Sequence, residues 1–592
     1  MTLPRIVWPL AVTLLLCFAF LALLGRPLPA QADAAPDGPV VARVAYRDRE
    51  ALQALADGGY DIWHVDQASR TAVVALDPAG WRRLSAAGYT LSVDRQRTAE
   101  AEAAPDTFAE GYSTVEELYA LLEQVAADHP GLAEVVDYGD SWERVEEGDA
   151  PGYDLLALRL TNRAITGTVP APGLDYRPDI TITKPVFFLM AGIHARELST
   201  HETARRFILY LTEGYGTDPD ATWLLDHHEI WIVPTANPDG YKVVENSDGQ
   251  PLYQRKNTND SYDSSCPSPT NQNSFHIGVD LNRNASFRWG SGGSSSSPCT
   301  QTYRGPSAAS EPEEQALEAL MQGLFNDQRD EADDTNAAPL DTSGVMISLH
   351  SYSDLVLWPW GWTREDSPNF EQLAQLGRKF ASYNKYTAGQ ASQALYLASG
   401  TTDDWSYGTL GIASYTFEIG AMPWDDSVCG GFFPRFSCQD TFWNLNRPAL
   451  LYAAKSARAP YQLPFGPDAL AVSLSEPTVE AGVTITLTAQ VSDTNNGGQN
   501  IGAASYSIDT PDWAEGAETL PMSAADGAFD SADEAALATI DTADLAPGRH
   551  ILFVRGRDAE GNWGPTSAVF LTVLPGEPAP LPLWLPLVQR TP

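Results

Sequence analysis

At 592 residues the chain is too long for one hydrophobic core, and at roughly 150 residues per domain it predicts three or four domains. Hydrophobic residues make up 43% of the chain, which excludes an intrinsically disordered protein. Its 37 basic and 77 acidic residues give a net charge of −40, which repels phosphate backbones and argues against nucleic acid as a partner.

The N-terminus has the pattern of a secretory signal. Arg5 precedes a long apolar run, and Ala30-Gln31-Ala32 forms a small-x-small cleavage site. We therefore expect a signal peptide over residues 1–32 and a secreted or extracellular protein, with no membrane span once the signal is removed. Because the apolar run is long for a cleaved signal, an uncleaved anchor and cell-surface attachment stay open as the alternative.

Without the signal, four cysteines remain, an even number that suits two disulfides outside the cytoplasm. Four cysteines allow three pairings. Proximity in the sequence favours Cys266 with Cys299 and Cys429 with Cys438.

Residues 40–94 predict a small α+β domain. Its expected strands and helices, in chain order, cover residues 41–46, 49–57, 60–65, 71–76, 81–87 and 89–93. This doubled β-α-β pattern is typical of a ferredoxin-like fold. Residues 95–107, which include Arg95 and Arg97, predict an exposed linker that a protease could cut.

Residues 108–458 predict an α/β domain. A capping box of Ser113 and Glu116 opens its first helix. Helical stretches then alternate with short apolar runs, each suited to a strand buried on both faces. The clearest runs are residues 185–190, 230–234, 344–349 and 414–418. This alternation predicts a sheet covered by helices.

The C-terminal part predicts a further domain. Residues 459–467 form a Pro-rich linker, and alternating polar and apolar residues beyond it indicate an all-β, immunoglobulin-like sandwich over residues 468–575. The Pro-rich apolar tail, residues 576–592, is too short to span a membrane. The role of the sandwich stays open, with binding of cell-surface or extracellular material as one hypothesis.

Two motifs in the middle domain suggest a metal site. His194-Ala195-Arg196-Glu197 follows an apolar run, and His and Glu three residues apart can direct a nitrogen and an oxygen at one zinc ion. His350 ends another apolar run, at the mouth of a buried strand where α/β sheets present ligands. Three protein ligands plus a water make a catalytic zinc site. Taken alone, each motif also fits a chance match or a core histidine.

Five motifs in order resemble the zinc metallocarboxypeptidases of the pancreatic carboxypeptidase A and B type, including their secreted bacterial, carboxypeptidase T-like relatives. The motifs are His194-Ala195-Arg196-Glu197, Gly278-Val279-Asp280-Leu281-Asn282-Arg283-Asn284, Leu349-His350-Ser351-Tyr352-Ser353, Asp404-Trp405-Ser406-Tyr407 and Tyr415-Thr416-Phe417-Glu418. The resemblance spans residues 108–458. It implies a mixed sheet, one Zn²⁺, and removal of C-terminal residues from peptides and proteins.

The resemblance also implies a role for each matching residue. The zinc ligands would be His194, Glu197 and His350. Asp280 would fix the tautomer of the first histidine. Glu418 would be the general base and acid, which takes a proton from water and returns it to the leaving amine.

The remaining matches concern the substrate. Arg255 would polarise the scissile carbonyl and hold the oxyanion. Asn282 and Arg283 would bind the terminal carboxylate, for which a guanidinium fork is suited. Tyr396 would close over the substrate, and Arg196 would be an auxiliary substrate-binding arginine.

Asp403 falls at the position that sets pocket chemistry in this family, and an acid there predicts a preference for C-terminal Lys or Arg, with broad specificity as the alternative. Residues 40–94 would then be an inhibitory prodomain. Two other readings stay open: an inactive binding module that kept the fold, and a hydrolase of cell-wall peptides. Retention of Asn282 and Arg283 favours ordinary peptide C-termini.

Overall fold

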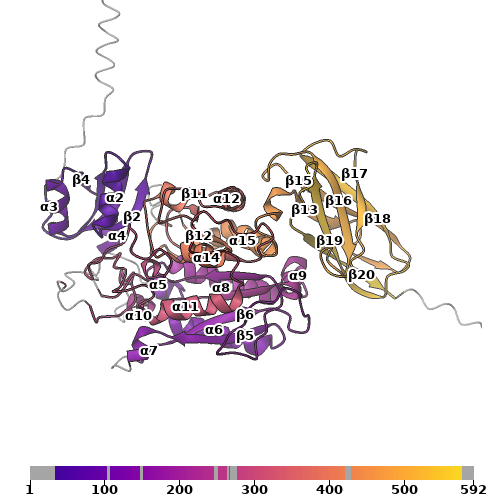
Figure 1. Ribbon diagram of the computed structural model, residues 1–592. Helices are drawn as coiled ribbons and strands as arrows, with labels where there is room; N and C mark the ends of the chain where they lie inside the picture. The colour runs from indigo at the N-terminus through magenta and orange to yellow at the C-terminus, as the bar shows by residue number, and fades with distance from the viewer. Residues whose placement is uncertain are drawn as a thin grey trace, which may run out of the picture. The chain divides into compact units, whose positions relative to one another are not determined.

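The computed structural model describes residues 34–102, 107–146, 151–245, 251–262, 266, 277–420 and 429–575 (Figure 1). The predicted signal and the C-terminal tail lie outside these ranges. Backbone contacts divide the chain into two compact units. The first runs to Ala103 and leaves out Ala56–Gly59, and the second holds the rest. Within the described residues, no helix is both long enough and apolar enough to cross a bilayer.

The first unit is a four-stranded antiparallel sheet with three helices. Its elements are β1 (Val40–Ala45), α2 (Arg49–Asp57), β2 (Asp61–Asp66), β3 (Thr71–Leu76), α3 (Pro78–Ala86), β4 (Thr90–Val93) and α4 (Arg95–Glu102). The strand order is β2-β3-β1-β4, and every neighbouring pair is antiparallel. Up to β4, the elements follow the order that the sequence predicts.

Helix α4 occupies most of the predicted linker. The Asp94 carboxylate accepts the backbone N–H of Arg97 and forms a 3.1 Å ion pair with its guanidinium. The Thr98 hydroxyl accepts the N–H of Val41 on β1 at 3.0 Å. Because these bonds hold the helix against the sheet, Arg97 is buried. Arg97 is therefore not exposed as the composition suggests, whereas Arg95 is exposed.

The second unit contains an eight-stranded mixed sheet in the order β11-β10-β12-β9-β7-β8-β6-β5. Its strands are β5 (Ala133–Asp140), β6 (Asp154–Leu160), β7 (Val186–Met190), β8 (Glu229–Val233), β9 (Val345–His350), β10 (Leu355–Trp358), β11 (Thr387–Gln390) and β12 (Ala413–Glu418). The four central strands, β12, β9, β7 and β8, are parallel. Three of them, β7, β8 and β9, are buried along their whole length, as the apolar runs predict.

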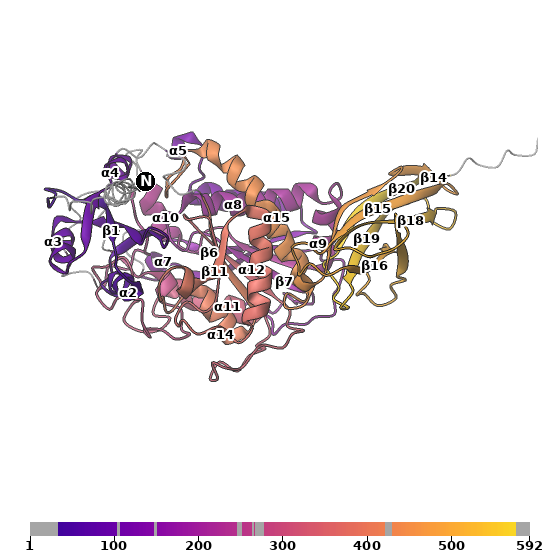
Figure 2. The ribbon, with the colours of Figure 1, turned by 90° about the horizontal axis from the view of Figure 1, so that it is seen from above.

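Helices surround this sheet. They are α5 (Thr107–Glu110), α6 (Val115–Asp128), α7 (Trp142–Glu146), α8 (Leu198–Gly214), α9 (Pro219–His227), α10 (Pro238–Glu245), α11 (Pro312–Leu324), α12 (Phe370–Asn384), α13 (Ala391–Ala394), α14 (Thr402–Leu410) and α15 (Gln439–Ser456). Helices α12 and α15 pack side by side (Figure 2). Helices must cover both faces of the central strands, because an apolar sheet face exposed to water is unfavourable in free energy.

The first capping box lies one residue later than predicted. Thr114, rather than Ser113, accepts the N–H of Glu117, and the Glu117 carboxylate accepts the N–H of Thr114. Both registers satisfy the motif. The Glu116 carboxylate instead accepts hydrogen bonds from the Tyr153 hydroxyl and the Lys242 ammonium.

The C-terminal strands form a second eight-stranded β structure within the same compact unit, and most of their buried residues make a second core cluster. They are β13 (Asp468–Leu474), β14 (Thr478–Glu480), β15 (Thr484–Ser492), β16 (Ile501–Ile508), β17 (Leu520–Ala524), β18 (Asp533–Asp541), β19 (Gly548–Asp558) and β20 (Ser567–Leu574). Strand β15 alternates buried and exposed residues as predicted. Residues 459–467, expected as a linker, are largely buried, and the Tyr461 hydroxyl donates to the carbonyl of Gly411 at 2.8 Å.

Both predicted disulfides are present. Cys266 pairs with Cys299 and Cys429 pairs with Cys438.

Candidate active site

Three side chains from two strand ends meet at the carboxyl edge of the mixed sheet. His194 and Glu197 lie on the turn between β7 and α8, and His350 ends β9. The Nδ1 atoms of His194 and His350 are 3.1 Å apart, and the Glu197 carboxylate lies 2.8 Å and 3.1 Å from them. All three residues are buried, and their facing donor atoms lie within 4.8 Å of one another.

The outer nitrogen of each histidine has a different partner. Nε2 of His194 lies 3.2 Å from Asp280, and Nε2 of His350 lies 3.1 Å from the Ser348 hydroxyl. Each partner can accept the Nε2–H, which leaves the lone pair of Nδ1 facing inward. Two inward nitrogens and one carboxylate form a donor set that fits Zn²⁺.

The pKa shifts of His194 and Glu197 favour the forms that a metal needs, whereas the Glu197 carboxylate, against the effect of burial, raises the pKa of His350. Burial and the nearby Arg255 guanidinium lower the pKa of His194, which favours the neutral ring. Although burial opposes ionisation, the His194 and His350 rings hold the pKa of Glu197 well below its usual range. Metal ligation requires neutral histidine and ionised carboxylate, so both shifts favour binding.

Glu418 is placed beside the three ligands by strand pairing. It ends β12, and in the parallel ladder with β9 it lies opposite His350. The N–H of the next residue, Ile419, donates to the carbonyl of His350 at 2.7 Å. Burial raises the pKa of Glu418 to about 7, against the opposing effect of His350. A carboxyl group with a pKa near neutrality is suited to taking up and returning a proton.

Arg255 approaches the ligands from a loop. Its Nε and Nη2 donate to Asp280 Oδ2 at 3.1 Å and 3.0 Å, and its Nη1 lies 4.0 Å from Glu197 Oε1. Although burial opposes ionisation, this guanidinium holds the pKa of Asp280 far below its usual range. Asp280 therefore links the first histidine to Arg255.

Comparison with known proteins agrees with this geometry. A family model described as zinc carboxypeptidase matches residues 118–447, more than half of the chain. The chain belongs to the zinc carboxypeptidase family. Carboxypeptidase A2 of Rattus norvegicus is 31% identical over 317 residues, which are 52% of this chain and 63% of that protein. Carboxypeptidase B2 of the same species is 30% identical over 325 residues, 53% of this chain and 64% of that protein.

Solved structures show the same fold. The carboxypeptidase A of Helicoverpa armigera superposes with a TM-score of 0.55 at 23% identity, covering 72% of this chain and 98% of that one. Thrombin activatable fibrinolysis inhibitor superposes with a TM-score of 0.51 at 24% identity, covering 71% of this chain and 99% of that one. The chain spans less than two thirds of the length of the two curated relatives above. Its likeness to carboxypeptidase T stays a prediction.

The predicted carboxylate-binding pair, Asn282 and Arg283, lies on a short 3-10 turn, Leu281–Arg283. Asp280 caps that turn by accepting the N–H of Asn282 at 3.1 Å. The Asn282 amide oxygen accepts the N–H of Thr402 at the start of α14. Arg283 is buried, and its Nη1 donates to the carbonyl of Asn282 at 2.6 Å. The Asn282 amide nitrogen lies 3.4 Å from Nε2 of His350, so this turn adjoins the cluster of His194, Glu197 and His350.

Asp403 and Tyr396, the other two residues predicted to contact substrate, lie in α14 and in the loop before it. Asp403 is buried in the first turn of α14, and its carboxylate accepts a 3.4 Å bond from the Thr416 hydroxyl on β12. Tyr396 is half-buried in the loop between α13 and α14. Asp403 therefore contacts β12 at Thr416, which is two residues before Glu418 on that strand.

Two further contacts were not predicted. Ser348 supports His350, and it could have been found because residues two apart on a strand share a face. Phe432 covers Arg196, with the guanidinium carbon 4.2 Å from the ring centroid. Phe432 lies far along the chain in an irregular segment, so no sequence pattern marks it.

Proposed function

We propose that the protein is a secreted zinc-dependent carboxypeptidase that removes C-terminal residues from peptides and proteins. The observation that carries this proposal is the convergence of His194, Glu197 and His350 at one sheet edge, with Glu418 opposite His350 in the β9–β12 ladder. A bound Zn²⁺ would supply Lewis-acid polarisation at this edge. A module that only binds ligands has no need of a proton-accepting carboxyl group beside the three ligands.

The chain's own residues supply the proton transfer. With its raised pKa, Glu418 takes a proton from the attacking water and returns it to the leaving amine. Arg255, whose place is fixed by Asp280, donates hydrogen bonds to the carbonyl oxygen as negative charge develops there. His194 keeps its inward lone pair because Asp280 accepts the proton of Nε2.

Binding of the terminal carboxylate would make the enzyme an exopeptidase. Arg283 presents a planar guanidinium, which matches a carboxylate in geometry and charge. Asn282 contributes its amide N–H group, and Tyr396 closes over the bound residue. Arg196, buried under Phe432, holds the substrate further from its C-terminus.

The buried carboxylate of Asp403 favours Lys or Arg as the released residue. An incoming cationic side chain pairs with it, whereas an apolar side chain would desolvate the carboxylate without a partner. The net charge of −40 does not repel basic substrates.

The first compact unit has the role of a ferredoxin-like, inhibitory prodomain in this proposal. Its support is its folding as a unit distinct from the rest of the chain. The presence of two disulfides agrees with export to an oxidising compartment.

A peptide panel tests the function. Zinc-loaded protein is incubated with N-terminally blocked peptides that differ only in the last residue, and mass spectrometry follows the release of single residues. We expect release from free C-termini, fastest for Lys and Arg, and none from matched C-terminal amides, which lack the charge that Arg283 binds. Cleavage of amides at the same rate, or no cleavage of any peptide, would contradict the proposal.

A further inference from the structure

The segment that carries Arg255 belongs to no helix or strand. Its backbone is instead fixed by separate contacts. The carbonyl of Arg255 accepts the N–H of Ala195, on the turn of the metal ligands, at 3.1 Å. The Asn257 N–H donates to the carbonyl of Val279 at 3.1 Å, and the Asn257 side-chain oxygen accepts the Val279 N–H at 2.8 Å. Because no regular ladder supports this segment, the place of Arg255 depends on such contacts.

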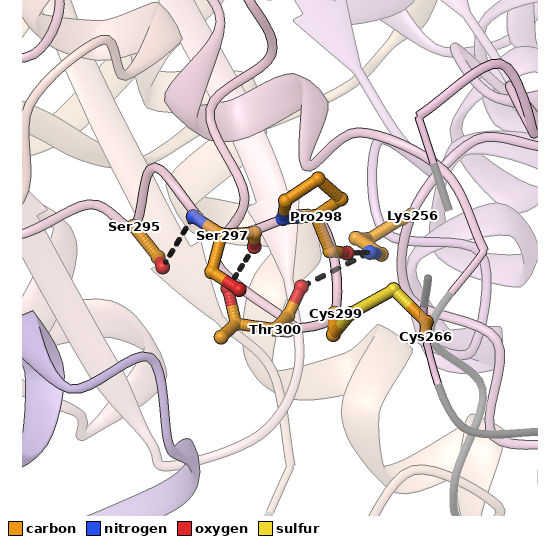
Figure 3. Close-up of a disulfide and its surroundings, with 7 residues drawn as sticks. All are labelled: Lys256, Cys266, Ser295, Ser297, Pro298, Cys299 and Thr300. Carbon is orange, nitrogen blue, oxygen red and sulfur yellow. Dashed lines mark hydrogen bonds between the residues drawn. A yellow bond between two sulfur atoms is a disulfide. The ribbon is translucent and has the colours of Figure 1, made fainter. Parts of the chain in front are cut away.

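The next residue, Lys256, adds a further contact. Its side chain is fully buried, and its ammonium donates to the carbonyl oxygens of Pro298 and Thr300 at 3.0 Å each (Figure 3). The ammonium also lies 5.9 Å from the centroid of the Tyr303 ring. A buried ammonium is costly unless it is hydrogen-bonded, so the lysine and its two acceptors hold one another in place.

The two acceptors flank Cys299, which is disulfide-bonded to Cys266. Figure 3 shows the turn around this bond. The N–H and hydroxyl of Thr300 donate to the carbonyl of Ser297 at 3.2 Å and 2.9 Å, and the Ser297 N–H donates to the Ser295 hydroxyl at 3.1 Å. The carbonyls that receive Lys256 therefore sit on a braced, cross-linked turn.

We propose that Lys256 is a positioning residue that connects the turn at the Cys266–Cys299 disulfide to Arg255. By holding the Lys256 ammonium between two carbonyls, the turn fixes the backbone beside Arg255 and so sets where its guanidinium meets the developing oxyanion. This inference rests on the proposed function, because it takes Arg255 as the oxyanion donor. In this proposal the disulfide contributes to catalysis without touching the substrate.

The test compares two buried lysines in the zinc-loaded protein. Lys184 is a matched control, because its ammonium is also buried and donates to the Thr161 hydroxyl and the Asn162 carbonyl at 2.7 Å and 2.8 Å. We expect Lys256→Met to lower kcat roughly tenfold to a hundredfold with little change in KM, the size that a small misplacement of a catalytic group produces. Lys184→Met should lower the melting temperature and leave kcat near wild type. Equal kcat values for the two variants would overturn the proposal.

A tetrahedral phosphonate peptide and a flat product-like carboxylate serve as binding probes. Because Arg255 acts on the tetrahedral state, Lys256→Met should weaken binding of the phosphonate by the same factor by which it lowers kcat. Binding of the product-like ligand should weaken by less than about threefold. Lys256→Arg keeps the charge and the donors and should recover most of kcat. Equal weakening of both probes would mean a general disturbance of the site and would overturn the proposal.

A double-mutant cycle separates this inference from the proposed function. In an Arg255→Met background, Lys256→Met should add less than about threefold, since residues that act through one group are not additive. Multiplicative losses would overturn the positioning role alone. A wild-type rate in Arg255→Met would instead refute the assigned role of Arg255, and with it this inference. Should Lys256→Met fail to bind zinc or fold, the Cys266→Ser/Cys299→Ser variant takes its place, with the same kcat-selective loss expected.

Discussion

The candidate active site draws its two halves from different kinds of structure. His350 and Glu418 stand at the ends of neighbouring parallel strands, so the hydrogen-bond ladder of β9 and β12 sets their separation. Arg255 stands on an irregular segment whose place depends on a buried lysine, an asparagine and a disulfide-bonded turn. Geometry set by a ladder tolerates the loss of single side chains, whereas geometry set by a few polar contacts does not.

The strongest test of the ladder half is Glu418→Gln. The amide keeps the shape but cannot take up a proton, and losing a general base typically lowers kcat by about 10²-fold to 10⁴-fold. Zinc stoichiometry should stay at one, because Glu418 is not one of the three converging ligands. A variant within threefold of the wild-type rate would refute the assignment.

The loop half is tested by Arg255→Met. Removing a single oxyanion donor typically lowers kcat by about 10²-fold to 10³-fold. The variant also leaves Asp280 without the guanidinium that lowers its pKa, so zinc affinity is measured alongside by competition with a chelator. A higher KM with an unchanged kcat would show that Arg255 binds the substrate equally well in the ground state and the transition state.

Asp403→Ala examines the pocket, where helix α14 fixes the side chain. We expect kcat/KM for C-terminal Lys and Arg to fall roughly tenfold to a hundredfold, with Phe and Leu substrates unaffected or improved. The measurement is a set of matched peptides. An equal fall for every substrate would show that Asp403 supports the fold and does not select substrates.

The smallest effect concerns the polar network behind the loop. Glu313 is buried, accepts the N–H of Trp142, and lies 3.3 Å from the Asn257 amide. Burial, with Glu311 nearby, raises its pKa to about 8. Because its folded pKa exceeds the unfolded value, its contribution to stability is full below about pH 4.5 and is lost as the pH rises through about 8.

Glu313→Gln has no such titration. The fall in unfolding free energy between pH 5 and pH 8 should therefore be smaller than in wild type, by about 1 kcal/mol or more. Urea unfolding at several pH values measures this. The same slope in both proteins would mean that Glu313 does not titrate in this range.

The sequence predicted the ladder half better than the loop half. The apolar runs correctly predicted β7, β8, β9 and β12, and the ordered motifs place His350 at the end of β9 and Glu418 at the end of β12. The bracing of Lys256 by residues 42 and 44 positions away has no local signature. Helix α4 was missed because its residues show no apolar periodicity, and a cap from Asp94 with bonds to β1 holds it instead. Such contacts depend on tertiary structure.

Zinc titration of the metal-free protein tests the central claim most directly. After removal of metal by a chelator, hydrolysis of a blocked peptide ending in Lys should be absent, and it should rise in proportion to added Zn²⁺ until one equivalent is bound. His350→Ala should lose both the tight binding and the hydrolysis, because it removes one of three ligands. Full hydrolysis by the metal-free protein, or by His350→Ala, would contradict the account.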